Sequence, residues 1–149
     1  MIKHIQAGIL DMSFSGGEER LDSLIDFASR ENPKRGFLFV SKVLGKHIPV
    51  DPGVMRAIYN ELADLCCVDD SVYVVGMSET ATGLGAGVAD SISRKNRECE
   101  VFYQHTTRHI LDCPTWFTLK EAHSHAVDHI MYQPNDEVYL GVMSVKKLI

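Results

Sequence analysis

The chain has 149 residues and a formal net charge of −5 at pH 7, with 45% hydrophobic and 23% charged residues. These values are typical of a folded domain with a substantial core, and they exclude a disordered or fibrous chain. The acidic balance disfavours nucleic-acid binding, which requires a basic surface, and no apolar run reaches the roughly 20 residues of a membrane helix.

The N-terminus and the cysteines bear on the cellular compartment. The first residues show no sustained apolar segment and no small-residue cleavage site, so we expect a cytoplasmic protein without membrane association. Cys66, Cys67, Cys99 and Cys113 have no CxxC spacing. We therefore expect reduced, partly buried thiols rather than disulfides or zinc ligands.

The first predicted elements are an extended arm and a helix. Residues 2–15 predict a strand or hairpin arm that ends at Gly16 and Gly17. Residues 18–31 predict a helix, because acidic residues occupy its first turn and the apolar residues share one face. We expect one domain over residues 1–149, with the arm at 1–17 and the α/β core at 18–149.

A strand, a basic loop and a second helix follow. Residues 36–40 predict a short buried strand, and the loop at 41–50 carries three potential cations. Residues 52–66 predict a helix with Asp51 as its N-cap and Pro52 at its first position. The expected core face consists of Met55, Ile58, Leu62 and Leu65.

The stretch at residues 72–92 organises the rest of the chain. Four apolar residues at 72–75 predict a strand buried on both faces, and Leu84, Val88 and Ile92 predict the apolar face of a helix. The small and polar residues at 76–83 predict the loop between them. Such a loop at the carboxyl end of a sheet, followed by a helix N-terminus, favours an anion such as phosphate or pyrophosphate. The alternative is an ordinary connection whose glycines only permit tight packing.

The second half of the chain continues the alternation. Strands are predicted at 101–103 and 116–119, a short helix between 133 and 144, and the first half of a strand at 145–149. Strands that alternate with helices predict an α/β fold with a mostly parallel sheet flanked by helices.

Three polar groups follow predicted strands, where an α/β sheet gathers its ligands. The first group is Ser41, Lys42, Lys46 and His47; the second is Ser78, Glu79, Thr80 and Thr82; the third is Thr106, Thr107 and Arg108, followed by Lys120, Glu121, His123, His125 and His129. A solvated basic loop is the alternative for the first group.

The histidines of the third group also allow a metal-site hypothesis. His125 and His129 would share one face of a helix, whereas His123 and His125 would share one face of a strand. One segment satisfies both geometries only with a bend between them, and the HExxH arrangement is absent. Locally hydrogen-bonded histidines, or an anion-binding or lid segment, are the other interpretations.

Four blocks of the sequence carry a resemblance to a known family. They are residues 32–52 (NPKRGFLFVSKVLGKHIPVDP), 74–92 (VVGMSETATGLGAGVADSI), 105–108 (HTTR) and 120–134 (KEAHSHAVDHIMYQP). Together they resemble the orotate-phosphoribosyltransferase-like family of tellurium-resistance gene clusters. The resemblance extends from about residue 31 to the last residue. It implies a type I phosphoribosyltransferase fold and a reaction of 5-phosphoribosyl-1-pyrophosphate (PRPP) with a nitrogenous base such as orotate, with Mg²⁺ chelating the pyrophosphate.

The resemblance also implies roles for individual residues. The pyrophosphate loop would comprise Gly76, Ser78, Glu79, Thr80, Ala81, Thr82 and Gly83, and Ser41, Lys46 and His47 would touch the base or the pyrophosphate. The catalytic set would be Lys42, Arg108, Lys120, Glu121, His123 and His125, with residues 120–129 in a flexible lid. Relatives of this kind are usually dimers, so a homodimer is expected.

The sequence departs from the family in one motif. Type I enzymes carry an acidic pair and a Thr/Gly loop directly after an apolar strand, and no such pair follows a strand in these residues. We expect that motif after residue 149, which predicts an N-terminal portion with little turnover of its own. The alternatives are a non-catalytic protein that binds a phosphorylated metabolite or a partner, and a metal-binding protein that uses the histidine cluster.

Overall fold

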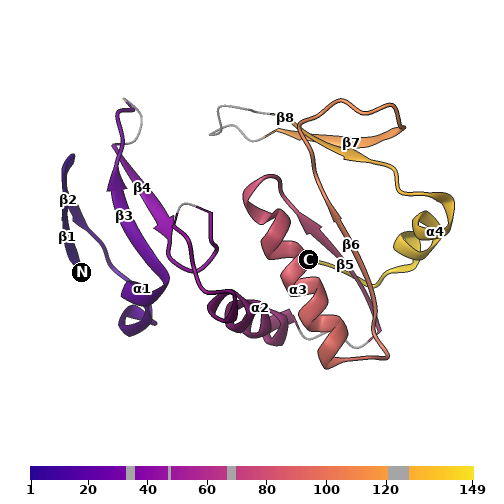
Figure 1. Ribbon diagram of the computed structural model, residues 1–149, viewed down its shortest axis with the longest axis horizontal. Helices are drawn as coiled ribbons and strands as arrows, with labels where there is room; N and C mark the ends of the chain where they lie inside the picture. The colour runs from indigo at the N-terminus through magenta and orange to yellow at the C-terminus, as the bar shows by residue number, and fades with distance from the viewer. Residues whose placement is uncertain (33–35, 47, 67–69, 121–127) are drawn as a thin grey trace. The chain divides into compact units, whose positions relative to one another are not determined.

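The computed structural model describes residues 1–32, 36–46, 48–66, 70–120 and 128–149 (Figure 1). The chain forms two compact units, Met1–Met55 and Arg56–Ile149, and each is described by itself. Among the described residues, none of the helices has the length and apolar character needed to span a membrane.

The first unit is built from two antiparallel pairs of strands. β1 (Ile2–Ile5) pairs with β2 (Gly8–Asp11), which confirms the predicted hairpin arm. The short helix α1 (Glu18–Leu24) leads directly into β3 (Ile25–Ser29), which pairs with β4 (Phe37–Ser41). The strand predicted at 36–40 is therefore present, but its neighbour is antiparallel.

The prediction of one helix over residues 18–31 is wrong in its second half. The helix ends at Leu24, and Ile25 takes an extended conformation. From there the chain pairs residue by residue with β4, from Ile25 opposite Ser41 to Ser29 opposite Phe37. The rings of Phe27 and Phe39 meet edge to face, with centroids 5.5 Å apart. Cross-strand pairing and aromatic packing outweigh the helical spacing of the apolar residues.

The second unit contains the parallel sheet. β5 (Ser71–Gly76) lies between β6 (Glu100–His105) and the short β9 (Lys147–Leu148), and both neighbours run parallel to it. α2 (Pro52–Cys66), which begins in the first unit, and α3 (Thr80–Lys95) flank this sheet. β7 (Thr115–Lys120) and β8 (Asp128–Tyr132) form an antiparallel pair, and α4 (Asp136–Ser144) follows.

The fold is therefore mixed α/β with one three-stranded parallel sheet. The other sheets described are antiparallel pairs, so the prediction of a mostly parallel sheet holds only for β6, β5 and β9. The boundaries of α2 agree with the prediction, and Asp51 Oδ1 accepts a hydrogen bond of 2.7 Å from the Gly53 N–H.

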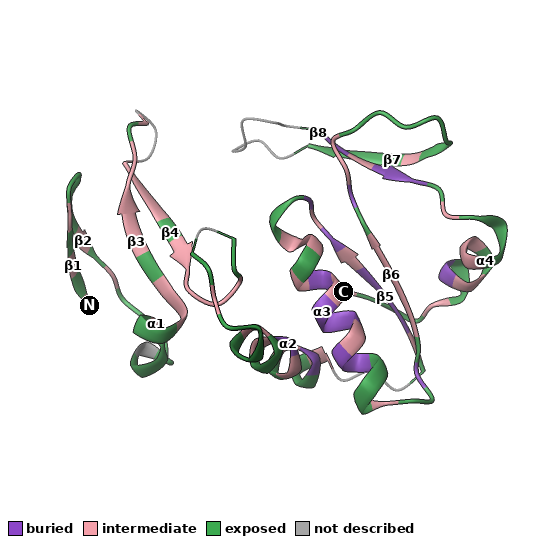
Figure 2. Ribbon diagram, viewed as in Figure 1, coloured by how far each residue is buried: buried purple, intermediate pink, exposed green. Residues whose placement is uncertain are grey.

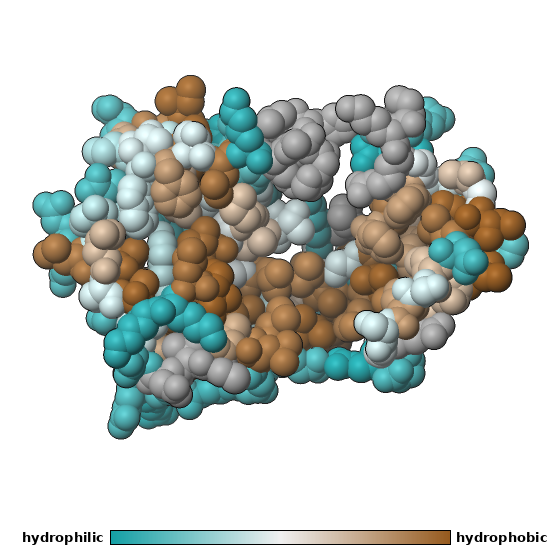
Figure 3. Space-filling model, turned by 180° about the vertical axis from the view of Figure 1, so that it is seen from behind, coloured by the Kyte–Doolittle hydropathy of each residue, from teal (hydrophilic) through white to brown (hydrophobic). Residues whose placement is uncertain are grey.

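The core of the second unit lies between β5 and the two helices, where buried residues are concentrated (Figure 2). Its buried members are Ala63, Val72, Val74, Val88, Ala89, Ile92 and Cys99. On α2 the buried side chains are Tyr59 and Ala63, whereas Leu65, expected in the core, is 78% exposed. Cys66, Cys99 and Cys113 are free thiols. Large apolar side chains also reach the surface of each unit, among them Ile9 and Ile110. Figure 3 shows hydrophobic residues on the face of the molecule that it presents.

Candidate functional site: the polar cluster after β5 and β6

The loop after β5 is shorter than the sequence predicts. Gly76 ends the strand, α3 begins at Thr80, and only residues 77–79 lie between them. The Ala81 N–H already donates to the Met77 carbonyl at 2.9 Å, which closes the first turn. Of the residues predicted for the loop, Thr80, Ala81, Thr82 and Gly83 thus form the first turn of α3. The small side chains there leave the helix free to start immediately after the turn.

Gly76 allows the helix to start this close to the strand. A Cβ atom at position 76 would lie 2.5 Å from the carbonyl oxygen of Ala81 and 3.0 Å from the hydroxyl of Tyr103. The Tyr103 hydroxyl donates a 2.6 Å hydrogen bond to the Thr82 carbonyl, and burial raises the pKa of this phenol. The end of β5 and the start of α3 are therefore held together through a glycine contact and a tyrosine hydroxyl.

A buried polar cluster holds the loop to the end of β6. The Ser78 N–H donates to Thr106 Oγ1 at 2.8 Å, and the Thr106 hydroxyl lies 3.1 Å from Ser78 Oγ. Thr106 Oγ1 is also 3.0 Å from Nδ1 of His129, which comes from β8. Ser78, Thr106 and His129 are each buried. The cluster joins segments that follow β5 and β6 to a residue of the antiparallel pair.

Arg108 brings a positive charge to this cluster. Its guanidinium Nη2 lies 3.3 Å from His129 Nε2 and 3.5 Å from the carbonyl oxygen of Ser78. The side chain is partly buried, and buried charges interact more strongly with a ligand than surface charges do. A cation beside a loop at a helix N-terminus is an arrangement that suits an anionic ligand.

The structure assigns the other predicted site residues to different places. Glu79, Thr80 and Gly83 are exposed beside the loop, and Lys120 is exposed at the end of β7. In the first unit, Ser41 Oγ accepts hydrogen bonds from the N–H groups of Val43 and Leu44. Lys42 Nζ donates to the Asp22 carbonyl at 2.6 Å, and Lys46 is exposed in the same loop. His47, Glu121, His123 and His125 lie outside the described residues.

Thr106 and His129 belong to the third polar group of the sequence analysis, but neither is in the catalytic or binding sets that the resemblance implies. Thr106 is the first residue after β6 and Ser78 the second residue after β5, so the rule that placed polar groups after strands found both of them. His129 sits in a strand whose next residues are Ile130, Met131 and Tyr132, a pattern that indicates a core position. Its role becomes visible only once β8 is placed beside residue 107, to which Ile130 is bonded.

The metal hypothesis receives no support from His129. Both of its ring nitrogens lie within hydrogen-bond distance of protein groups, and one of these groups is a cation. Among the residues described, no group of three or more His, Cys, Asp or Glu side chains is placed to hold a metal ion.

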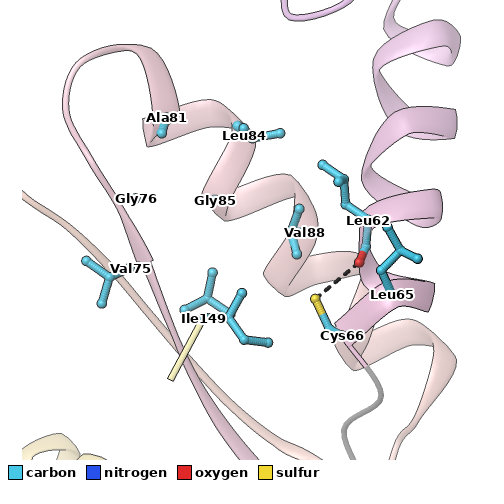
Figure 4. A pocket seen from close by; sticks show the side chains of 11 residues that line it. Leu62, Leu65, Cys66, Val75, Gly76, Ala81, Leu84, Gly85, Val88 and Ile149 are labelled. Carbon is cyan, nitrogen blue, oxygen red and sulfur yellow. Dashed lines mark hydrogen bonds between the residues drawn. The ribbon is translucent and has the colours of Figure 1, made fainter. Parts of the chain in front are cut away.

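An apolar cavity of about 310 Å³ lies near the same loop (Figure 4). It is lined by residues of α2, β5 and α3 together with Ile149, and Gly76 and Ala81 belong to its wall. The Cys66 thiol donates to the Leu62 carbonyl at 3.1 Å beside this cavity. The apolar lining does not suit a phosphate, so the polar cluster is the candidate anion site.

A parallel strand, a short loop and a helix, with a cation at the carboxyl end of the sheet, form the strand–loop–helix unit of an α/β protein. A family model for phosphoribosyl transferases matches residues 24–146, which is most of the chain. The chain therefore belongs to the phosphoribosyl transferase family. The comparisons with curated proteins and with solved structures gave no match.

Proposed function

We propose that this chain binds the pyrophosphate group of a phosphoribosyl donor at residues 76–83 and takes part in phosphoribosyl transfer to a nitrogenous base. The observation that carries the proposal is the cluster of three buried residues, Ser78, Thr106 and His129, with the partly buried Arg108, found in a member of the phosphoribosyl transferase family. The positive end of the α3 dipole lies at the same loop and favours an anion there.

The reaction itself sets what the site must do. The bond from C1 of the ribose to the pyrophosphate oxygen breaks, the pyrophosphate leaves with the electron pair, and the base nitrogen bonds to C1. Negative charge therefore grows on the departing pyrophosphate. Arg108 and the positive end of the α3 dipole would stabilise it there, and groups that are already in place stabilise such charge without reorganisation. Lys120, exposed at the end of β7, would add a cation from the lid segment that the resemblance implies.

The residues present fit a magnesium ion that arrives with the substrate. Mg²⁺ is usually held by one or two carboxylates and by substrate phosphates rather than by an all-protein cage. Glu79 is an exposed carboxylate in the loop and would serve as such a ligand. The ion would neutralise charge on the pyrophosphate oxygens.

Calorimetric titration tests the binding site. We expect inorganic pyrophosphate and PRPP, each with Mg²⁺, to bind the unmodified chain, and Arg108→Gln to weaken both affinities by about tenfold or more, as expected for a lost charge-assisted contact. Arg94→Gln is the matched control, because Arg94 is an exposed arginine in the last turn of α3. Equal losses in the two variants, or no binding by the unmodified chain, would contradict the proposal.

Activity with a panel of bases tests the reaction. Orotate is the first base to try, given the resemblance of residues 120–129 to the lid of the orotate enzymes, and pyrophosphate release measures the transfer. Release that depends on one base would identify the acceptor. Binding of PRPP without release with any base would instead favour the alternative of a non-catalytic protein that binds a phosphorylated metabolite.

A further inference from the structure

His129 is enclosed by the cluster and contacts it with both ring nitrogens. Only 1% of the residue is exposed, although its strand β8 belongs to the antiparallel pair and not to the parallel sheet. Nδ1 lies 3.0 Å from Thr106 Oγ1, and Nε2 lies 3.3 Å from the Arg108 guanidinium. The identity of these two partners determines which nitrogen carries the proton.

The partner of Nε2 decides the tautomer. A guanidinium has five N–H donors and no acceptor, so a hydrogen bond between Arg108 and His129 requires a lone pair on Nε2. A neutral imidazole with a lone pair on Nε2 has its proton on Nδ1. Nδ1 therefore donates to Thr106 Oγ1.

The direction of the remaining bonds follows from this assignment. Thr106 Oγ1 accepts from His129 and also from the Ser78 N–H at 2.8 Å, which occupies both of its lone pairs. The Thr106 hydroxyl therefore donates its own hydrogen bond to Ser78 Oγ, 3.1 Å away. Because Ser78 Oγ accepts the hydrogen bond from Thr106, the Ser78 hydroxyl is left to donate its own hydrogen to a group outside the cluster.

The result is a chain of hydrogen bonds that all point one way. Arg108 donates to His129, His129 to Thr106, and Thr106 to Ser78. Successive bonds of one direction polarise each other, most strongly where water is excluded, and here the first donor is a cation. The last hydroxyl is thus a strengthened donor, and its best partner is an acceptor without protons, such as a phosphate oxygen.

We propose that His129, as its Nδ1–H tautomer, is a positioning residue that links Arg108 to Thr106 and so orients the Ser78 hydroxyl toward an oxygen of the bound pyrophosphate. The ligand part rests on the function proposed above. The hydrogen-bond chain itself rests only on the contacts of Ser78, Thr106, Arg108 and His129.

Long-range proton–nitrogen NMR of the histidine rings tests the tautomer in the unmodified chain without ligand. We expect the His129 ring to have a protonated Nδ1 and an unprotonated Nε2, with its signals assigned by their loss in His129→Gln. A ring protonated on Nε2, or on both nitrogens, would overturn the proposed direction of the chain. This measurement needs neither activity nor a variant that binds ligand.

A double-mutant cycle with inorganic pyrophosphate and Mg²⁺ tests the route through Ser78. His129→Leu and Ser78→Ala should each weaken binding by about tenfold, and the double variant should lose no more than either single variant, because both act on one contact. His129→Asn, whose side-chain amide can still donate to Thr106, should retain more of the affinity than His129→Leu.

The outcomes separate the two proposals. Losses in the two single variants that multiply in the double variant would overturn the positioning role and leave a structural one. An unmodified chain that binds no pyrophosphate would overturn the proposed function and the ligand part with it. Thermal unfolding of every variant, with and without pyrophosphate, identifies those that bind weakly because they do not fold.

Discussion

Gly87 of α3 lies directly against the aromatic ring of Tyr59 on α2. A Cβ atom at position 87 would approach three ring carbons of Tyr59 to less than 3.0 Å, closer than Cβ atoms come in real structures. Tyr59 is 7% exposed, and the Arg56 guanidinium lies over its ring, 5.8 Å from the centroid. Arg56 also pairs with Asp90 of α3. This contact sets how closely the two helices pack over β5.

Gly87→Ala should therefore destabilise the second unit. The added methyl group would clash with the buried Tyr59 ring, and overpacking of this kind costs about 1–3 kcal/mol. Gly83→Ala is the control in the same helix, since a Cβ atom there meets nothing within 4 Å and alanine favours a helix by about 1 kcal/mol. Chemical denaturation of both variants should show a loss for position 87 and no loss for position 83. Equal stabilities would contradict this account of the packing.

Gly76→Ala should lose ligand binding as well as stability. The new Cβ atom would lie 2.5 Å from the Ala81 carbonyl oxygen, which belongs to the backbone of the first turn of α3, so the turn itself must shift. We expect pyrophosphate affinity to fall by about tenfold or more, because site geometry is sensitive to displacements of about 1 Å. Gly87→Ala is the comparison, as it is destabilised but distant in sequence from the loop. Calorimetry at a temperature where both variants are folded measures the difference, and unchanged affinity at position 76 would count against a ligand at this turn.

The sequence predicts the second unit better than the first. The run at 72–75 and the apolar residues at 84, 88 and 92 both have one consistent period, and the structure has β5 and α3 there. Residues 25–29 fit a helical spacing and a strand equally well, and only pairing with β4 decides between them. Local pattern is therefore sufficient where one period dominates, and insufficient where a partner strand makes the choice.

The candidate site was predicted in part for a similar reason. Ser78 and Arg108 follow strands of the parallel sheet, so their position in the sequence indicates the carboxyl edge. His129 reaches the same place from β8, and no spacing rule connects it with Ser78, which lies 51 positions earlier. The three-histidine pattern left a metal site, a lid and local hydrogen bonding open, and the structure shows local hydrogen bonding for His129. Only the tertiary structure joins His129 to Thr106.

Tyr103→Phe should change stability in a pH-dependent way. Near neutral pH the variant loses the hydroxyl bond to Thr82, at a cost of about 1 kcal/mol. Burial raises the pKa of Tyr103 in the folded state, while the unfolded state ionises near pH 10. The stability that Tyr103 contributes is therefore fully present below pH 10 and is lost as the pH rises through the pKa of Tyr103 in the folded state. Urea unfolding between pH 7 and 11 should show that the difference in the free energy of unfolding between the unmodified protein and Tyr103→Phe becomes smaller as the pH rises.

Tyr73→Phe provides the comparison for this alkaline effect. Burial also raises the pKa of Tyr73, and its hydroxyl donates to Gln104 Oε1 at 2.6 Å. Each single variant should remove part of the loss of stability at alkaline pH, and the double variant should remove more of it than either single variant. A gap between the unmodified protein and Tyr103→Phe that stays constant up to pH 11 would contradict a buried, protonated Tyr103.

Asp90→Asn should reduce the stability of the protein least at acidic pH. Hydrogen bonds from Arg94 and Arg56 lower the pKa of Asp90, so the folded state holds its carboxylate charged below the ordinary value of about 3.9. A depressed pKa gives stability that is present above the unfolded value and lost as pH falls through the folded one. Urea unfolding from pH 6 to pH 2 should therefore show the free energy of unfolding of the unmodified protein approaching that of Asp90→Asn as the pH falls. Arg94→Gln, which leaves Arg56 in place, should show a smaller convergence. A gap that is independent of pH would mean that Asp90 contributes through its shape and not through its charge.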